Sequence, residues 1–125
     1  MRKIIASIAT ATLLLLSMSA SADVAQVWRC TFADDATGDD LIALSKEWLA
    51  AAKEINDGAS AKVYFPVAAE AEEGAYIFVF YMPDFTAWGE FSDAYPDSPV
   101  AEVDSRWEGL GPCDVSGLWY TEDIE

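Results

Sequence analysis

Histidine is absent from this 125-residue sequence, cysteine occurs only twice, and Lys and Arg together number seven against 22 Asp and Glu residues. Without imidazole, Ser-His-Asp and Cys-His nucleophiles and the usual His/Cys zinc sites are excluded. The formal net charge of −15 predicts a surface that repels nucleic acid and anionic lipid headgroups, so neither is expected as a partner. Carboxylate, tyrosine, lysine and arginine chemistry remains, and the sequence assigns no catalytic residue and no cofactor.

Long hydrophobic runs are also scarce, and the one that is present lies at the start of the sequence. Arg2 and Lys3 precede an apolar run from Ile4 to Met18, and the small residues 20–22 follow it. This pattern is typical of a secretory signal peptide. We therefore expect residues 1–22 to be removed and residues 23–125 to form one exported α+β domain, either periplasmic or extracellular. No later run approaches the ~18 residues of a membrane span, so no membrane contact is expected after cleavage.

The two cysteines, Cys30 and Cys113, both fall in the expected mature chain. In an oxidising compartment an isolated pair predicts one disulfide, and neither cysteine has the neighbours of a metal site or a C-x-x-C redox centre. A disulfide would also remove the free thiol that cysteine catalysis requires.

Apolar alternation predicts four strands, at residues 24–32, 61–67, 75–82 and 117–124. The segment 75–82 is apolar on both faces, which places it at the centre of a sheet that is covered on both sides. Pro66 cannot donate a hydrogen bond to a neighbouring strand, and this favours an edge position for 61–67.

Helical spacing of apolar residues predicts three helices. The first opens at Asp39 and Asp40 and stops at Gly58. The second follows Asp84, with an inward aromatic stripe, and the third follows Ser98, with Glu102 paired to an arginine four residues later. The stripe comprises Phe85, Trp88, Phe91 and Tyr95, and the tryptophans at helical core spacings, Trp48 and Trp107 among them, are interpreted as core.

The resulting order, strand-helix-strand-strand-helix-helix-strand, is the ferredoxin-like split βαβ plan with an extra helix before the last strand. In that plan a four-stranded antiparallel sheet places the last strand beside the first, where the two cysteines would meet. The element order, the doubly apolar segment 75–82 and the domain size resemble the dimeric α+β barrel superfamily. The resemblance implies a homodimer formed through open sheet faces, and because histidine is absent it brings no catalytic residue with it.

Arg29 is the most informative polar position, because it lies in the middle of the first strand of a chain with few cations. Alternation places it on the face opposite Cys30, and we hypothesise that it shares an open sheet face with Tyr64, Tyr81 and Trp119. A guanidinium buried there needs a carboxylate from a partner subunit or a ligand. The alternative is an exposed or internally paired arginine whose stem covers apolar surface.

Three functions remain open from the sequence. The first is a non-catalytic module that dimerises, or binds a small apolar ligand, through the open sheet face. The second is a cofactor-independent lyase or oxygenase that uses Arg29 and a tyrosine in the same cavity. The third is weak Ca²⁺ or partner binding by Asp34, Asp35 and Asp39, for which the alternative is a solvated loop followed by helix N-terminal charges.

Overall fold

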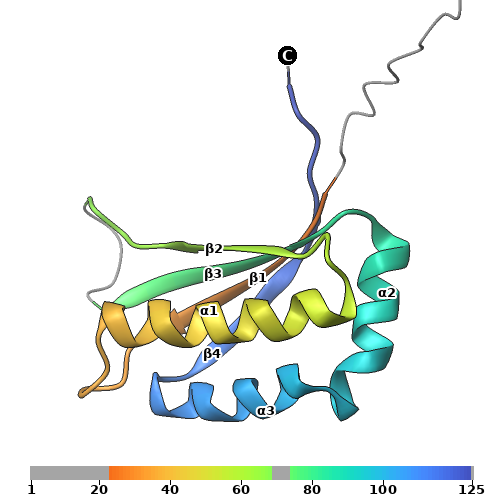
Figure 1. Ribbon diagram of the computed structural model, residues 1–125. Coiled ribbons are helices and arrows are strands. Elements are labelled where there is room, and N and C mark those ends of the chain that lie inside the picture. Colours follow the sequence, from red (N-terminus) through yellow and green to blue (C-terminus); the bar gives the residue numbers. More distant parts are fainter. Residues whose placement is uncertain (1–22, 69–73, 125) are drawn as a thin grey trace, which may run out of the picture.

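The computed structural model describes residues 23–68 and 74–124, so the expected signal peptide lies outside the described residues. Its strands form an antiparallel sheet in the order β2-β3-β1-β4, with helices packed on one face (Figure 1). The elements are β1 (Val24–Thr31), α1 (Gly38–Ile55), β2 (Ser60–Tyr64), β3 (Ala75–Met82), α2 (Phe85–Ala94), η1 (Tyr95–Asp97), α3 (Pro99–Ser105), η2 (Arg106–Gly109) and β4 (Cys113–Tyr120). The ferredoxin-like α+β fold is confirmed, with β3 central and an extra helix before the last strand.

Two strands differ from the predicted ranges. β2 ends at Tyr64, so Pro66 lies beyond the strand, although the strand does lie at the sheet edge. β4 begins at Cys113 rather than at residue 117, and it ends at Tyr120. Its pairing with β1 contains a register shift opposite Val27 and Trp28. Such an irregularity interrupts the two-residue alternation, which is why the pattern hid the first half of the strand.

α1 begins with a capping box that the sequence pattern did not reveal. The Thr37 hydroxyl accepts a hydrogen bond from Asp40 N at 3.2 Å, and Asp40 Oδ2 accepts one from Thr37 N at 3.0 Å. Together these bonds satisfy two backbone donors at the helix start. α1 buries its apolar stripe, including Leu41, Leu44 and Trp48. Neither α1 nor any other described helix is both long enough and apolar enough to cross a membrane.

The aromatic stripe of α2 is only partly inward. Asp84 caps the helix as expected, accepting a hydrogen bond from Ala87 N at 2.7 Å, and Phe91 is buried. Phe85, however, is 55% exposed and stacks on Tyr120 with a centroid distance of 6.4 Å. Phe85 is the first residue of the helix, and there the chain is still at the end of the sheet and has not yet reached the face that the helices cover.

The expected pair between Glu102 and Arg106 is not formed. α3 ends at Ser105, and the tighter winding of η2 displaces Arg106 from the position one α-helical turn after Glu102. Arg106 instead forms an ion pair with Glu47 of α1. This exposed pair links η2 to α1.

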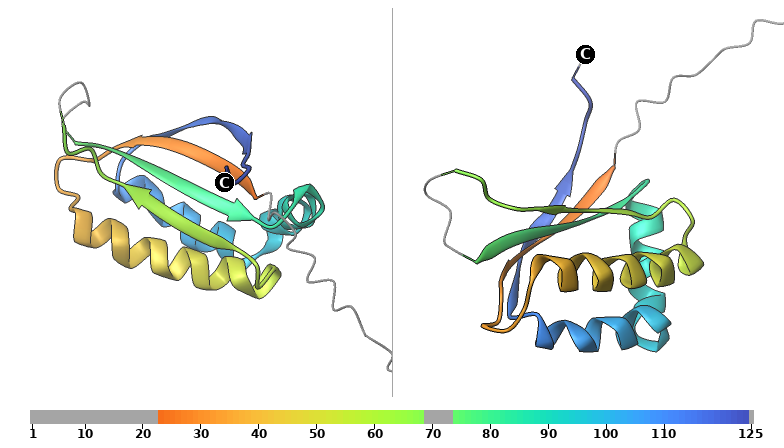
Figure 2. Two further views of the ribbon diagram at one scale, coloured as in Figure 1. Left: turned by 90° about the horizontal axis from the view of Figure 1, so that it is seen from above. Right: turned by 60° about the vertical axis from the view of Figure 1, so that its left-hand side comes forward.

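The core lies between β3 and the helices. Tyr76, Phe78, Phe80 and Met82 of β3 face α1 and α3, and each is at most 4% exposed. Figure 2 shows α1 and α3 running side by side beneath the sheet and α2 crossing one end. No other described element covers the opposite face, so Ile77, Val79 and Tyr81 of the same strand point away from the helices.

Candidate functional site

The described residues form a hollow on each face of the sheet. The open-face hollow has a volume of about 600 Å³ and is lined by Ala25, Val27, Arg29, Tyr64, Ile77, Val79, Tyr81, Trp119 and Thr121. The helix-side cleft has a volume of about 560 Å³ and lies between the sheet and the α3–η2 segment. Both volumes fall in the range of small-molecule sites.

The open-face hollow brings together all four residues that the sequence singled out. Tyr64 lies opposite Ile77, which in turn lies opposite Arg29, so one row crosses three strands. A second row places Tyr81 opposite Ala25 and Ala25 opposite Trp119. The shared face is therefore a finding, whereas ligand binding by these side chains stays a prediction.

Two tyrosines close one side of this hollow. Their hydroxyl oxygens, Tyr64 Oη and Tyr81 Oη, are 3.1 Å apart, and the Lys62 ammonium lies 5.7 Å from the centroid of the Tyr81 ring. Burial, the hydrogen bond to Tyr64 and nearby negative charge raise the pKa of Tyr81 to about 12. At neutral pH this phenol is protonated, so it can orient a bound group by hydrogen bonding but cannot act as a resident base.

The charge of the open-face hollow is opposite in sign to that of the whole chain. No carboxylate lines it, although the sequence contains 22 acidic residues. Arg29 is exposed, and among residues 23–68 and 74–124 it makes no ion pair. Asp114 is its cross-strand neighbour on β4. The guanidinium is thus available to an incoming carboxylate.

Gly117 shapes the β4 side of the hollow. Its φ of +146° is a conformation that favours glycine, and an added Cβ would lie 3.3 Å from Trp119 Nε1. The Trp119 indole consequently lies across the glycine and remains 57% exposed. A large aromatic surface is held in place on the open face.

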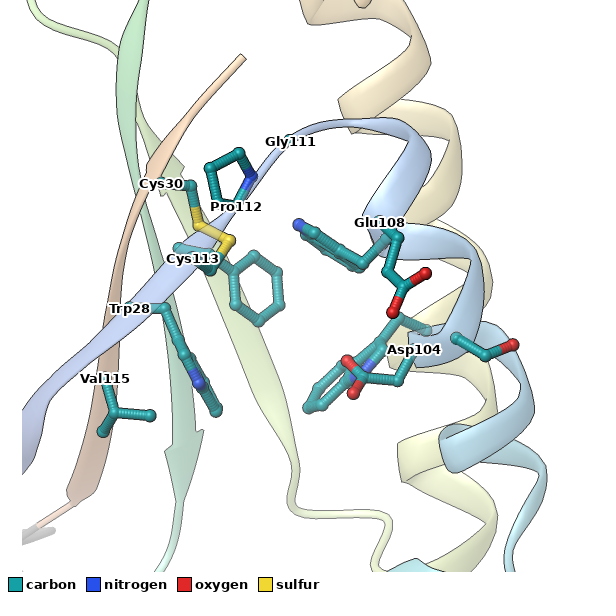
Figure 3. A pocket seen from close by; sticks show the side chains of 12 residues that line it. Trp28, Cys30, Asp104, Glu108, Gly111, Pro112, Cys113 and Val115 are labelled. Atoms are coloured by element: carbon teal, nitrogen blue, oxygen red, sulfur yellow. A yellow bond between two sulfur atoms is a disulfide. The ribbon is translucent and has the colours of Figure 1, made fainter. Parts of the chain in front are cut away.

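The helix-side cleft was missed by sequence reasoning. The prediction that Trp48 and Trp107 are core residues is confirmed, but they also line this cleft. Figure 3 shows Trp28 and Val115 pointing into the cleft from the sheet, and Asp104 and Glu108 pointing into it from the helical side. Its wall also includes Trp48, Phe78, Ser105 and Trp107, and Cys30, Gly111, Pro112 and Cys113 lie at the end where β4 begins. A carboxylate pair spaced four residues apart beside a tryptophan was the signal available in the sequence.

The aromatic rings of the cleft stand steeply to one another. Trp28 and Trp48 have a centroid distance of 6.5 Å and an interplanar angle of 74°, and Trp48 and Phe78 have values of 5.3 Å and 80°. Phe78 and Trp107 follow at 5.1 Å and 66°. Successive edge-to-face contacts therefore form walls at the corner of a box, not a parallel stack.

The disulfide Cys30–Cys113 closes one end of the cleft. These residues lie directly opposite one another in the pairing of β1 and β4, which confirms the predicted bond. The Tyr76 hydroxyl lies 3.8 Å from Cys113 Sγ and accepts a hydrogen bond from Trp107 Nε1 at 2.9 Å. Burial raises the pKa of Tyr76, so this phenol stays neutral in the core. No free cysteine is found in the described segments.

Two indole N–H groups beside the cleft lack acceptors within the described segments. Trp28 and Trp48 donate no hydrogen bond to another described residue. Among the fully buried side-chain polar atoms of these segments, only Ser45 Oγ has no hydrogen-bond partner. The Trp48 nitrogen also has no partner but is not one of these atoms, so it keeps access to solvent, although the side chain as a whole is only 3% exposed. Both groups can donate to a bound molecule.

The acidic loop has a different organisation from a metal site. Asp34 and Asp35 are exposed in the turn before α1, and Asp39 lies in the first turn of that helix. Asp40 is held by the capping box with Thr37. Within the described parts of the chain, no group of three or more His, Cys, Asp or Glu side chains is placed to hold a metal ion. Weak Ca²⁺ binding by the loop stays a prediction.

The sequence matches no family model and no curated protein. Solved structures resemble the chain in fold. SnoaB, a cofactor-independent oxygenase from Streptomyces nogalater, is 12% identical, with a TM-score of 0.59 over 82% of this chain and 95% of SnoaB. At3g17210 from Arabidopsis thaliana is 15% identical, with a TM-score of 0.54 over 82% of this chain and 94% of its own.

Rv0793 from Mycobacterium tuberculosis is 18% identical to the chain, with a TM-score of 0.52 over 82% of this chain and 96% of its own. Identities this low show a shared fold alone. These structures confirm the expected ferredoxin-like topology.

Proposed function

We propose that the protein is an exported, non-catalytic module that pairs with a second copy of itself through the open-face hollow. The observation that carries this proposal is the contrast between the hollow and the rest of the chain. Its floor is made of apolar side chains from central strands, its rim carries Trp119 and Tyr64, and no carboxylate lines it. An acidic protein with an apolar hollow that no acidic side chain lines has a surface suited to burial.

A second copy fits this face better than a solvent layer does. β3 carries Ile77, Val79 and Tyr81 on the uncovered side, and Val79 is already 6% exposed at the bottom of the hollow. Packing two such sheets face to face removes further apolar surface from water. Arg29 then has a carboxylate to meet, because its cross-strand neighbour Asp114 is presented on the same face of the second copy.

Export is proposed on separate grounds. The charged, apolar and small-residue order of residues 1–22 supports secretion, and the disulfide Cys30–Cys113 is stable in the oxidising compartments that secretion reaches. N-terminal sequencing of the secreted product tests this part of the proposal. A start at Asp23 supports it, and an intracellular product that retains Met1 contradicts it.

The pairing is tested by sedimentation velocity over the micromolar range with two matched variants on β4. Trp119 and Tyr120 are 57% and 58% exposed, but only Trp119 lines the open-face hollow. We expect a dimer for the unmodified protein and for Tyr120→Glu, and a monomer for Trp119→Glu. A monomeric unmodified protein, or equal association of both variants, contradicts the proposal.

A second candidate uses the same hollow for a small apolar molecule with an anionic end, either held or transformed. The arrangement that favours it is Arg29 on the same face as the hydrogen-bonded pair Tyr64 and Tyr81. A protonated Tyr81 can orient a substrate by hydrogen bonding, and this role requires no cofactor. Native mass spectrometry for a retained ligand, followed by a substrate screen with Arg29→Ala, tests it. Activity that is unchanged in Arg29→Ala excludes this hollow as the reaction site.

A further inference from the structure

The helix-side cleft combines an aromatic lining with negative charge. Trp28, Trp48 and Trp107 contribute indole rings, and Phe78 joins them through edge-to-face contacts. Asp104 and Glu108 are the charged residues of the lining, and both are exposed. No lysine or arginine lines the cleft, so its field attracts cations and repels anions.

Local contacts keep positive charge out of the cleft. Arg106 lies between the two carboxylates in sequence, yet it is held by Glu47 on the neighbouring helix and is not part of the lining. Asp104 accepts a hydrogen bond from the Tyr95 hydroxyl through Oδ2 at 2.5 Å, which orients the carboxylate and leaves Oδ1 without a hydrogen-bond donor among the described residues. The negative charge is therefore positioned and not neutralised by an internal cation.

The aromatic walls suit a cation that water binds weakly. The N–H of Trp107 is already hydrogen-bonded to Tyr76, so this indole presents only its hydrocarbon and π surface to the cleft. Edge-to-face packing holds these rings at different orientations along the wall of the cleft, and aromatic ring faces are the surfaces that recognise methylated ammonium groups. A metal ion needs more oxygen ligands than two carboxylates, whereas a quaternary ammonium needs ring faces and a counter-charge.

We propose that the helix-side cleft binds an organic cation, with a quaternary or methylated ammonium group against the tryptophans and Asp104 and Glu108 as counter-charges. The free N–H groups of Trp28 and Trp48 are donors for a hydroxyl or carbonyl group of the same ligand. The cleft lies on the opposite face of the sheet from the open-face hollow. Self-association there and cation binding here are therefore independent of each other.

The experiment compares choline chloride with its neutral analogue, in which a carbon atom replaces the quaternary nitrogen. Binding is measured by calorimetry and by the shifts of the indole N–H signals in NMR spectra. We expect choline to bind at least about tenfold more tightly than the neutral analogue and to shift the Trp28 and Trp48 signals. Equal binding of the two probes overturns the proposal, as does an absence of choline binding in the millimolar range by the folded protein.

Two substitutions on the same helical segment separate a local counter-charge from the general acidity of the chain. Glu108 lines the cleft, whereas Glu102 is an exposed residue of α3 that does not line it. We expect Glu108→Gln to weaken choline binding by about tenfold and Glu102→Gln to change it by less than about twofold. Equal effects would show that choline responds only to net charge, and this result also overturns the proposal.

Discussion

Trp107 donates a hydrogen bond from Nε1 to the hydroxyl of Tyr76 at 2.9 Å, in the core between β3 and η2. Tyr76 is 1% exposed, and its hydroxyl also lies 3.8 Å from Cys113 Sγ, which as half of a disulfide can only accept a hydrogen bond. One phenol therefore connects the wall of the helix-side cleft, the central strand and the disulfide. The position of Trp107 depends on this contact.

Tyr76→Phe should destabilise the protein by about 1–3 kcal/mol, because it leaves the Trp107 N–H buried without an acceptor. Tyr120→Phe is the matched control, since that ring is 58% exposed. The free energy of unfolding is measured by urea denaturation of both variants. An equal change in both would show that the buried hydrogen bond adds nothing to stability.

Breaking the disulfide should lower the stability substantially. Cys30 and Cys113 are separated by 83 residues in sequence, and the loss of loop-closure constraint on the unfolded chain corresponds to about 4.5 kcal/mol in the chain-entropy treatment. Thermal unfolding of the Cys30→Ala, Cys113→Ala double variant measures the loss. An unchanged melting temperature would mean that the sheet alone holds β4 against β1.

Tyr81 should titrate later than a free tyrosine, and its ionisation should couple to folding. Its pKa is about 12 in the folded protein against a usual value of 10.0, because burial and the bond to Tyr64 disfavour the phenolate. The resulting stabilisation is complete below pH 10.0 and is lost as the pH rises towards about 12. The difference in ultraviolet absorbance between the unmodified protein and Tyr81→Phe isolates this titration.

Removing the hydrogen-bond partner provides the control for that titration. In Tyr64→Phe the burial of Tyr81 remains but the bond between the hydroxyl groups is lost, so its pKa should fall part of the way towards 10.0. A difference titration with its midpoint already near 10.0 in the unmodified protein would contradict the contact between the two phenols.

The sequence predicted the fold well where a periodic pattern coincided with one environment. β3, with its two apolar faces, was predicted with its observed bounds, and α1 followed from its apolar stripe. Prediction was weaker where tertiary contacts overrode local signals. Arg106 forms an ion pair with Glu47, Phe85 stacks on Tyr120 at the end of the sheet, and the irregular pairing of β4 obscured where that strand begins.

The two hollows differ in how far sequence could lead to them. Alternation was sufficient to propose that Arg29 shares one face with Tyr64, Tyr81 and Trp119, but only the strand register of the structure brings the four together. The helix-side cleft depends instead on how Trp48 of α1 and Trp107 of η2 pack against their neighbours in the folded chain. Helical spacing shows that a tryptophan faces inward, but it does not show whether the space beside the ring is filled.

Gly111 should be intolerant of any side chain, because it lets the start of β4 approach the end of β1. Its φ is +125°, and an added Cβ would lie 1.9 Å from Thr31 O, a backbone atom that cannot rotate away. The backbone bonds from Thr31 N to Pro112 O and from Ala33 N to Leu110 O hold the two segments at this distance. Gly111→Ala should therefore separate the strands beside the disulfide and cost more than about 3 kcal/mol.

Gly109 provides the matched control for Gly111, two residues earlier in the same segment. An added Cβ there meets nothing within 4 Å, and its φ lies outside the glycine-favouring range. Gly109→Ala should leave the stability unchanged or raise it by up to about 1 kcal/mol, since it restricts the unfolded chain. Chemical denaturation of both variants gives the comparison. If Gly111→Ala were as stable as Gly109→Ala, the close approach of β1 and β4 at the closed end of the cleft would be wrong.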